Sequence, residues 1–220
     1  MNKDLAYHKL LHKRLSGGDV SFSDRILAFH RFKKQVSEIH GTILDVGCGN
    51  GYASVYLLKT FPKIKKIYLL ESSEEAVKNL IPRTLKHFEI HDKFEIIHGS
   101  FDNLNLNIKF DFIVSFGAIH HSSCLFKTLE CLNKSVKDEG YLILSEPSKS
   151  DFTTHAEYVK KYNTIEIKEG IELKNKERND HFYRVSEYKS ALIMNGFDII
   201  HENRTSKNKI LTFFKKIYFH

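Results

Sequence analysis

The stretch that decides the fold is Thr42-Ile43-Leu44-Asp45-Val46-Gly47-Cys48-Gly49-Asn50-Gly51. It predicts a buried strand that ends in a glycine-rich turn, and a helix is predicted directly after it, from Tyr52 to Leu58. The three alternate glycines permit positive φ angles and leave no side chain between the backbone and a ligand. The amides at the start of the helix point into the same space, which favours an anionic group there. We therefore expect a nucleoside-like cofactor at the carboxyl ends of a parallel sheet.

The composition is typical of one globular domain. The 220 residues are 41% hydrophobic and 28% charged, which suffices for a sizeable core. No run approaches the ~20 apolar residues of a membrane span, and the N-terminus lacks the apolar segment of a secretory signal. A cytoplasmic protein is expected. The cysteines form no CxxC pair, so neither disulfides nor a zinc site are predicted.

The net charge of +7 leaves two interpretations open. It is compatible with a nucleic-acid surface. The lysines, however, are scattered along the chain and alternate with acids, except beyond Arg204. A lysine-rich solvated surface is the favoured interpretation.

Residues 41–147 alternate between strands and helices, which predicts a parallel sheet with right-handed crossovers. The further strands are expected at residues 66–71, 94–98, 110–116 and 141–145. Ser72 and Glu75 predict a capping box for the helix after the second strand. Pro82 predicts a kink or break in that helical region.

The remaining segments complete a single domain, 1–220. Residues 1–40 predict an N-terminal helical cap, and residues 148–184 a polar, weakly periodic insertion on the substrate side. Residues 185–220 predict a helix and two strands. The connection between these strands is too short for a usual parallel crossover, so they should pair antiparallel.

The details of the opening stretch restrict the class of ligand that it can bind. A dinucleotide fingerprint needs a third glycine where Tyr52 stands, and the Gly-Lys-Ser/Thr of a phosphate-binding loop is absent. Asp45 is a costly buried carboxylate unless it has partners. It can organise the amides of the turn and reach an ammonium group through water. The turn therefore suits a zwitterionic amino acid better than a pyrophosphate.

Two further strand ends predict the rest of a nucleoside site. Glu71 follows Gly51 by about 20 residues, a spacing that suits an acid bonded to both ribose hydroxyls. Ser100, Phe101 and Asp102 follow the third strand, where Phe101 would form an apolar wall for an adenine and a polar neighbour would meet its amine. The alternatives are a solvated acid for Glu71 and an ordinary core residue for Phe101.

Together these features resemble the class I S-adenosylmethionine-dependent methyltransferase family. The likeness covers about residues 40–147, with a looser match in 184–214, and rests on the opening stretch, Glu71, residues 110–115 and residues 138–144. It implies an α/β Rossmann-like fold with helices on both faces of a seven-stranded, mostly parallel sheet whose last strand is antiparallel. It also implies that S-adenosyl-L-methionine is bound and released as S-adenosyl-L-homocysteine.

The resemblance assigns the methionine part of the cofactor to Asp45 and the glycines, the ribose to Glu71 and the adenine to Ser100 and Phe101. The family usually has an acid where Ser100 stands, so Asp102 is an alternative partner of the adenine. The full set of predicted cofactor-binding residues is Asp45, Gly47, Cys48, Gly49, Asn50, Gly51, Glu71, Ser72, Ser100, Phe101, Asp102, Ser115, Phe116 and Gly117.

Histidines are the candidates for proton transfer. His120 and His121 follow the fourth strand, where the methyl group should emerge, and histidine titrates near neutrality. One of them is predicted to be a general base; the alternative is that they orient the loop or pack under it. His181 and Tyr183 of the insertion are further substrate-side candidates. No HExxH or paired Cys/His spacing occurs, so no catalytic metal is predicted.

The expected reaction is in-line methyl transfer to an O or N atom of a small molecule or metabolic intermediate, for example a sugar. The Asn/Asp-Pro-Pro-aromatic tetrapeptide of amino-methylating nucleic-acid enzymes is absent after the fourth strand. The alternatives are an RNA or protein methyltransferase that uses the basic surface and a non-catalytic binding module. An antiparallel edge strand rich in Phe213, Phe214, Tyr218 and Phe219 can pair with another chain, so the sequence leaves a homodimer open and does not determine the oligomeric state.

Overall fold

The computed structural model describes residues 38–163, 165–168, 171–174, 181, 183–204 and 209–216. The helices expected in residues 1–40 lie outside the described residues, apart from residues 38–40, which are irregular. Tyr218 and Phe219 also lie outside them.

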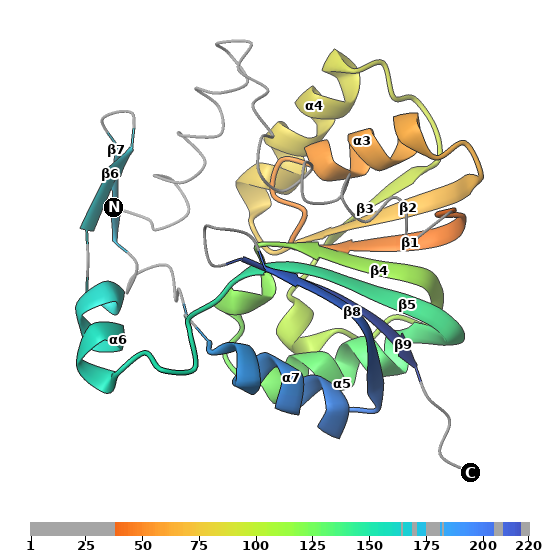
Figure 1. Cartoon of the computed structure of the whole chain (residues 1–220). Helices are drawn as coiled ribbons and strands as arrows, with labels where there is room; N and C mark the ends of the chain where they lie inside the picture. Colours follow the sequence, from red (N-terminus) through yellow and green to blue (C-terminus); the bar gives the residue numbers. More distant parts are fainter. Residues whose placement is uncertain are drawn as a thin grey trace.

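The core is a seven-stranded sheet in the order β3-β2-β1-β4-β5-β9-β8 (Figure 1). Its strands are β1 Gly41–Val46, β2 Ile64–Glu71, β3 Phe94–His98, β4 Phe110–Phe116, β5 Val136–Pro147, β8 Phe197–Arg204 and β9 Lys209–Lys216. Strands β1 to β5 pair in parallel, and β9 is antiparallel to both β5 and β8. The predicted α/β class with a mostly parallel sheet is confirmed, and so is the antiparallel pairing of the two final strands.

Helices cover both faces of this sheet. On one face lie α3 Tyr52–Thr60, the π-helical turn Ala76–Leu80 and α4 Ile81–His87; on the other lie α5 Leu125–Ser135 and α7 Val185–Met194 (Figure 1). Each face has its own apolar cluster, one containing Leu57 and Ile81 and the other containing Leu129 and Leu192. The central strands are therefore apolar on both sides, which is why β1 is an almost continuous hydrophobic run.

The helical region after β2 corrects one local prediction. The capping hydroxyl is that of Ser73, which accepts a hydrogen bond from the Ala76 amide at 3.3 Å, whereas Ser72 lies one residue earlier, against Glu71. The capping-box assignment of Ser72 is therefore wrong by one residue. At Pro82 the helix is not split: the backbone stays right-handed helical at Leu80 and Ile81 and changes from a π turn to α4, in which Pro82 is the second residue.

The strand order corrects the predicted dimer edge. Because β9 pairs with β5 on one side and β8 on the other, its backbone hydrogen bonds are already used within the sheet. Phe213 and Phe214 therefore stand in an internal strand, and the edge strand is β8. The prediction that this strand is an edge is therefore wrong, and the homodimer itself stays a prediction.

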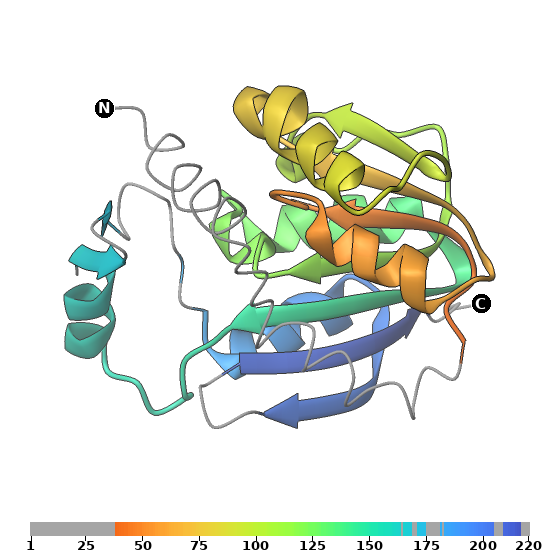
Figure 2. The ribbon, with the colours of Figure 1, turned by 90° about the horizontal axis from the view of Figure 1, so that it is seen from above.

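The insertion after β5 contains a helix, α6 His155–Tyr162, and a small antiparallel hairpin, β6 Ile165–Lys168 with β7 Ile171–Lys174. These elements lie beyond the carboxyl end of β5, which is also the end at which the parallel strands β1 and β4 finish (Figures 1 and 2). Within the described ranges, every helix falls short of the length and apolar character needed to cross a membrane.

Candidate active site

The glycine turn closes between β1 and α3 as the sequence predicts. Gly47, Gly49 and Gly51 have φ angles of 63°, 60° and 77°, the left-handed region that glycine adopts without strain. A Cβ on Gly47 would lie only 2.5 Å from that of Ala118, whereas nothing lies within 4 Å of a Cβ built on Gly49. The turn therefore packs tightly against the loop after β4 on one side and leaves open space at its middle glycine, where a ligand can approach the backbone.

Cys48 and Asn50, which lie between these glycines, stabilise the turn through hydrogen bonds. The Cys48 amide donates to Leu70 of β2 at 3.1 Å, and the Cys48 carbonyl accepts from the Gly51 amide at 2.9 Å. Asn50 accepts a hydrogen bond from the Tyr52 amide at 3.2 Å, at the start of α3. Burial and the nearby acids raise the pKa of the Cys48 thiol well above its usual range, so this thiol stays protonated.

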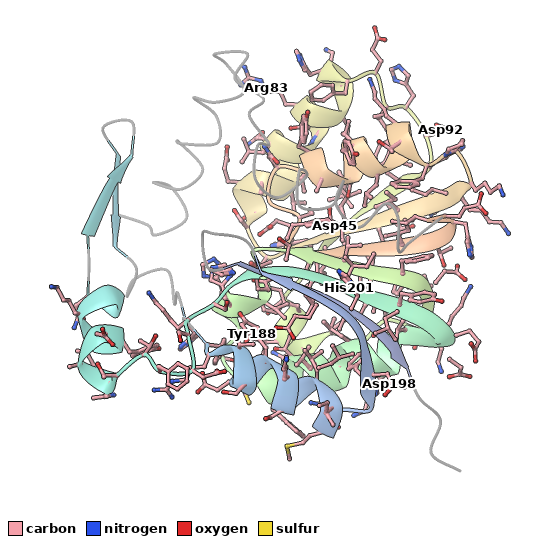
Figure 3. The ribbon with its side chains drawn as sticks, viewed as in Figure 1. Asp45, Arg83, Asp92, Tyr188, Asp198 and His201 are labelled. Carbon is pink, nitrogen blue, oxygen red and sulfur yellow. The ribbon has the colours of Figure 1, made fainter. Side chains whose placement is uncertain are left out.

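Asp45 is a buried carboxylate at the end of β1, and only 1% of its surface is exposed (Figure 3). Ser54 of α3 donates a hydrogen bond to it at 2.7 Å. Burial raises the pKa of Asp45 to about 7, although the Ser54 bond opposes this shift, and the nearby Glu71 charge adds to it. A cation placed beside Asp45 would favour its ionised form, which matches the ammonium partner predicted for it.

Glu71 joins the end of β2 to the glycine turn. Its Oε2 atom accepts a hydrogen bond from the Gly49 amide at 2.8 Å, and its Oε1 atom accepts from the amides of Ser72 and Ser73 at 2.9 and 3.0 Å. The structure thus brings the predicted ribose acid against the predicted methionine turn. Ser72 is exposed beside them and contributes its backbone amide.

The turn after β3 contains the predicted adenine residues. Phe101 opens the short 3-10 helix Phe101–Asn103, and its ring lies 3.5 Å from the Cβ position of Gly47. Ser100 accepts a hydrogen bond from the Asp102 amide at 3.1 Å. The Asp102 carboxylate is bonded to Ser123 and Thr128 at the start of α5. Phe101 therefore reaches the glycine turn, whereas the Asp102 carboxylate is occupied elsewhere.

At the end of β4, the three predicted residues Ser115, Phe116 and Gly117 run along β5. The Ser115 hydroxyl donates to Glu146 of β5 at 2.7 Å, and the Gly117 amide donates to the Ser145 carbonyl at 2.7 Å. The predicted contacts of these three residues with the cofactor stay predictions.

His120 and Glu146 form a buried pair at the carboxyl ends of β4 and β5. The Nδ1 atom of His120 lies 2.8 Å from Oε2 of Glu146, and the two side chains are only 8% and 2% exposed. Glu146 also accepts hydrogen bonds from the Ser115 hydroxyl and from the Ala118 and Ile119 amides, at 2.7, 3.1 and 3.3 Å. Burial alone would raise the pKa of Glu146, but the hydrogen bonds from His120, Ser115 and Ala118 outweigh it and lower that pKa.

These hydrogen bonds determine the ionisation state of Glu146 and the tautomer of His120. Glu146 is an ionised acceptor at neutral pH, so a neutral His120 carries its proton on Nδ1, and its Nε2 atom is the basic nitrogen. The tautomer is assigned from this hydrogen-bond network. Glu146 carries no predicted role from the sequence. The signal that could have indicated it is an acid two residues after the apolar run 141–144, at the carboxyl end of a parallel strand and directly before Pro147.

The remaining histidine candidates lie around this pair. The ring centroids of His120 and His121 are 3.9 Å apart, and the His181 amide donates to the His120 carbonyl at 3.0 Å. His181 in turn stacks on Tyr183, with 5.4 Å between the ring centroids. The end of the insertion therefore meets the loop after β4. Among the described residues, no group of three or more histidine, cysteine or acidic side chains is arranged to hold a metal ion.

Comparisons with known proteins agree with this geometry. A family model described as a methyltransferase domain matches residues 18–202. Malonyl-[acyl-carrier protein] O-methyltransferase of Priestia megaterium is 30% identical over 105 residues, which are 47% of this chain and 35% of that protein. The tRNA U34 carboxymethyltransferase of Campylobacter fetus is 33% identical over 103 residues, 46% of this chain and 35% of that protein. The chain thus spans about a third of the length of these two relatives.

Solved structures show the same fold. An S-adenosylmethionine-dependent methyltransferase from Clostridium acetobutylicum aligns with a TM-score of 0.69 at 15% identity, over 96% of this chain and 98% of that one. A SAM-dependent methyltransferase from Aquifex aeolicus aligns with a TM-score of 0.63 at 20% identity, over 88% and 90% of the two chains.

The chain belongs to the class I S-adenosylmethionine-dependent methyltransferase family. The predicted family, its enzyme class and its cofactor, S-adenosylmethionine, are confirmed.

Proposed function

We propose that the chain transfers a methyl group from S-adenosylmethionine to an oxygen or nitrogen atom of a small molecule or metabolic intermediate. The observation that carries this proposal is the buried pair of His120 and Glu146, at the carboxyl ends of strands that run parallel to β1 and therefore at the same end of the sheet as the glycine turn. A pair of this kind is useful for an acceptor that must lose a proton as it is methylated, such as a hydroxyl group.

The cofactor residues are proposed from the contacts around the turn. Asp45 and the glycine amides would hold the amino acid end, Glu71 the ribose hydroxyls and Phe101 one face of the adenine. The residues fit such a molecule because the middle of the turn is open at Gly49 and because the buried Asp45 carboxylate is bonded to a neutral hydroxyl, that of Ser54. When bound, S-adenosylmethionine supplies a methyl group already activated by its sulfonium charge.

The chain itself then has three tasks. It aligns the acceptor with the methyl group, it excludes water, and it removes a proton where the acceptor carries one. His120 would take that proton on Nε2, and the Glu146 carboxylate would hold the ring in position and stabilise the imidazolium. Glu146 acts through His120 and is therefore a positioning residue in this scheme.

The substrate side is assigned to the insertion. His181 and Tyr183 stand next to His120 through the His181 amide bond and the ring stack. We propose that residues 148–184, together with the N-terminal segment 1–40, close over a small acceptor in a cytoplasmic enzyme. The relatives act, by their names, on an acyl-carrier-bound malonyl group and on tRNA, so a macromolecular acceptor is the alternative that the experiment must separate.

The experiment incubates the protein with S-adenosylmethionine carrying a labelled methyl group and cell extract separated into small-molecule, RNA and protein fractions. The proposal expects label in the small-molecule fraction. Label confined to the RNA or protein fraction would replace the small-molecule proposal with the corresponding macromolecular one. Binding of the cofactor without labelling of any fraction would favour a non-catalytic binding module.

A further inference from the structure

The loop between β4 and α5, residues 117–124, is held at both ends by a carboxylate from another element. At its start, Glu146 of β5 accepts hydrogen bonds from the amides of Ala118 and Ile119. At its end, Asp102 accepts hydrogen bonds from the amide and the hydroxyl of Ser123, at 3.1 and 2.8 Å. His120 and His121 lie between these two attachments.

The Asp102 carboxylate has a further contact deeper in the molecule. Its Oδ1 atom accepts a hydrogen bond from the hydroxyl of Thr128 at 2.8 Å, and Thr128 is fully buried on α5. Both carboxylate oxygens are thus engaged by one continuous segment, Ser123 to Thr128. Three hydrogen bonds to one carboxyl group attach the turn after β3 to the start of α5.

The same turn reaches the cofactor side. Phe101 immediately precedes Asp102, and its ring lies 3.5 Å from the Cβ position of Gly47. The Asp102 amide also donates to the Ser100 hydroxyl, so the carboxylate and the predicted adenine residues belong to one short 3-10 turn. A displacement of this turn moves Ser123, because the bonds to Asp102 connect them directly.

We propose that Asp102 is a positioning residue that couples the adenine side of the cofactor site to the loop carrying His120 and His121. The coupling rests on the proposed function in one respect, the assignment of Ser100 and Phe101 to the adenine. Asp102 does not touch the adenine in this scheme. It keeps the loop ordered when the cofactor is bound, and it orders the adenine turn when the loop is in place.

The test uses S-adenosylhomocysteine as the probe, so that no methyl acceptor is needed. Its affinity is measured by calorimetry for the wild type, Asp102→Ala, Asp102→Asn and Thr128→Val. Asp92→Ala is the matched control, an exposed acid at the outer edge of the molecule (Figure 3). Hydrogen exchange of the amides in residues 121–128 is then compared in complexes saturated with the probe.

The proposal expects Asp102→Ala and Thr128→Val each to lower the affinity for S-adenosylhomocysteine by about fivefold. In both saturated complexes the amides of residues 121–128 should exchange about tenfold faster than in the wild type. Residues 43–51 should be protected as in the wild type, and Asp102→Asn should be intermediate because one acceptor oxygen remains.

Two results would overturn the proposal while leaving the cofactor site in place. A loss of affinity in Asp102→Ala with wild-type affinity in Thr128→Val would make Asp102 a direct ligand of the cofactor. Unchanged exchange in residues 121–128 for both variants would show that the loop does not depend on this contact. If Asp102→Ala fails to fold, Asp102→Asn takes its place in both comparisons with Thr128→Val. A wild type that does not bind the probe would instead refute the cofactor site itself and, with it, the coupling.

Discussion

The Nδ1 atom of His120 lies 2.8 Å from Oε2 of Glu146, and both side chains are buried where β4 and β5 end. This pair couples two parallel strands that are neighbours in the sheet, with Phe116 opposite Ser145 in the register. An ionised carboxylate held by amides and a hydroxyl is a fixed acceptor, so the orientation of the imidazole is set before any ligand arrives.

Replacing Glu146 by Gln is predicted to slow methyl transfer by about 10–100-fold, because the neutral amide neither fixes the tautomer of His120 nor stabilises its charged form. The affinity for S-adenosylhomocysteine should stay within about twofold of the wild type. The measurement is the rate of label transfer at saturating S-adenosylmethionine into the fraction that accepts it. Glu130→Gln, an exposed acid on α5, is the control. A Glu146→Gln protein with the wild-type rate would contradict the positioning role.

Replacing Glu71 by Ala is predicted to weaken cofactor binding by about 1–3 kcal/mol, the loss expected for a charge-assisted partner. The variant lacks the carboxylate that accepts a hydrogen bond from the Gly49 amide at 2.8 Å and that is proposed to bind the ribose hydroxyls. Calorimetry with S-adenosylhomocysteine measures this loss. The control is Glu95→Ala, an exposed acid on β3 paired with Lys66. Equal affinities for Glu71→Ala and the wild type would place the ribose elsewhere.

The raised pKa of Asp45 predicts that the free energy of unfolding of the protein depends on pH. Burial raises its pKa from 3.8 to about 7, so the folded state retains a proton that the unfolded state releases. The stabilising effect of that proton is complete below pH 4 and is lost as the pH rises through 7. Asp45→Asn removes this dependence.

We expect the free energy of unfolding of Asp45→Asn, relative to the wild type, to increase by about 2–3 kcal/mol between pH 5 and pH 8. Urea unfolding without cofactor at the two pH values measures this difference, with Asp92→Asn as the control at an exposed position. A difference that does not change with pH would show that Asp45 titrates in its ordinary range.

Replacing two glycines of the turn by alanine is predicted to lower the free energy of unfolding by different amounts. Gly49→Ala must adopt a φ of 60° in open space, which costs about 1–2 kcal/mol. Gly47→Ala meets the same strain and also places its Cβ 2.5 Å from that of Ala118, which adds about 1–3 kcal/mol of overpacking. Urea unfolding should therefore rank Gly47→Ala as the less stable variant. The reverse ranking would mean that the turn and the loop after β4 are not packed together.

Much of the fold is predictable because its signals are local. The apolar runs of the parallel strands, the glycines after β1 and the acid at Glu71 each stand within one element or at its end. The order of the last strands is not local: β9 inserts between β5 and β8, which no pattern within residues 197–216 specifies. The predicted edge strand was wrong for that reason.

The site was predictable to the extent that its residues follow strands. His120 has its partner 26 residues away, and the role of Glu146 appears only when β4 and β5 are paired. The orientation of Asp102 likewise depends on Thr128, which α5 brings to it from another part of the chain. These contacts come from the packing of whole elements, so residue type and spacing do not reveal them.

The most direct test of the account is the rate of labelled methyl transfer from saturating S-adenosylmethionine by His120→Ala, compared with the wild type and with the exposed-site control His91→Ala. If His120 is the general base, the His120→Ala rate falls by about 10²–10⁴-fold while its affinity for S-adenosylhomocysteine and the rate of the control are unchanged. A His120→Ala protein that methylates the acceptor at the wild-type rate would contradict that role.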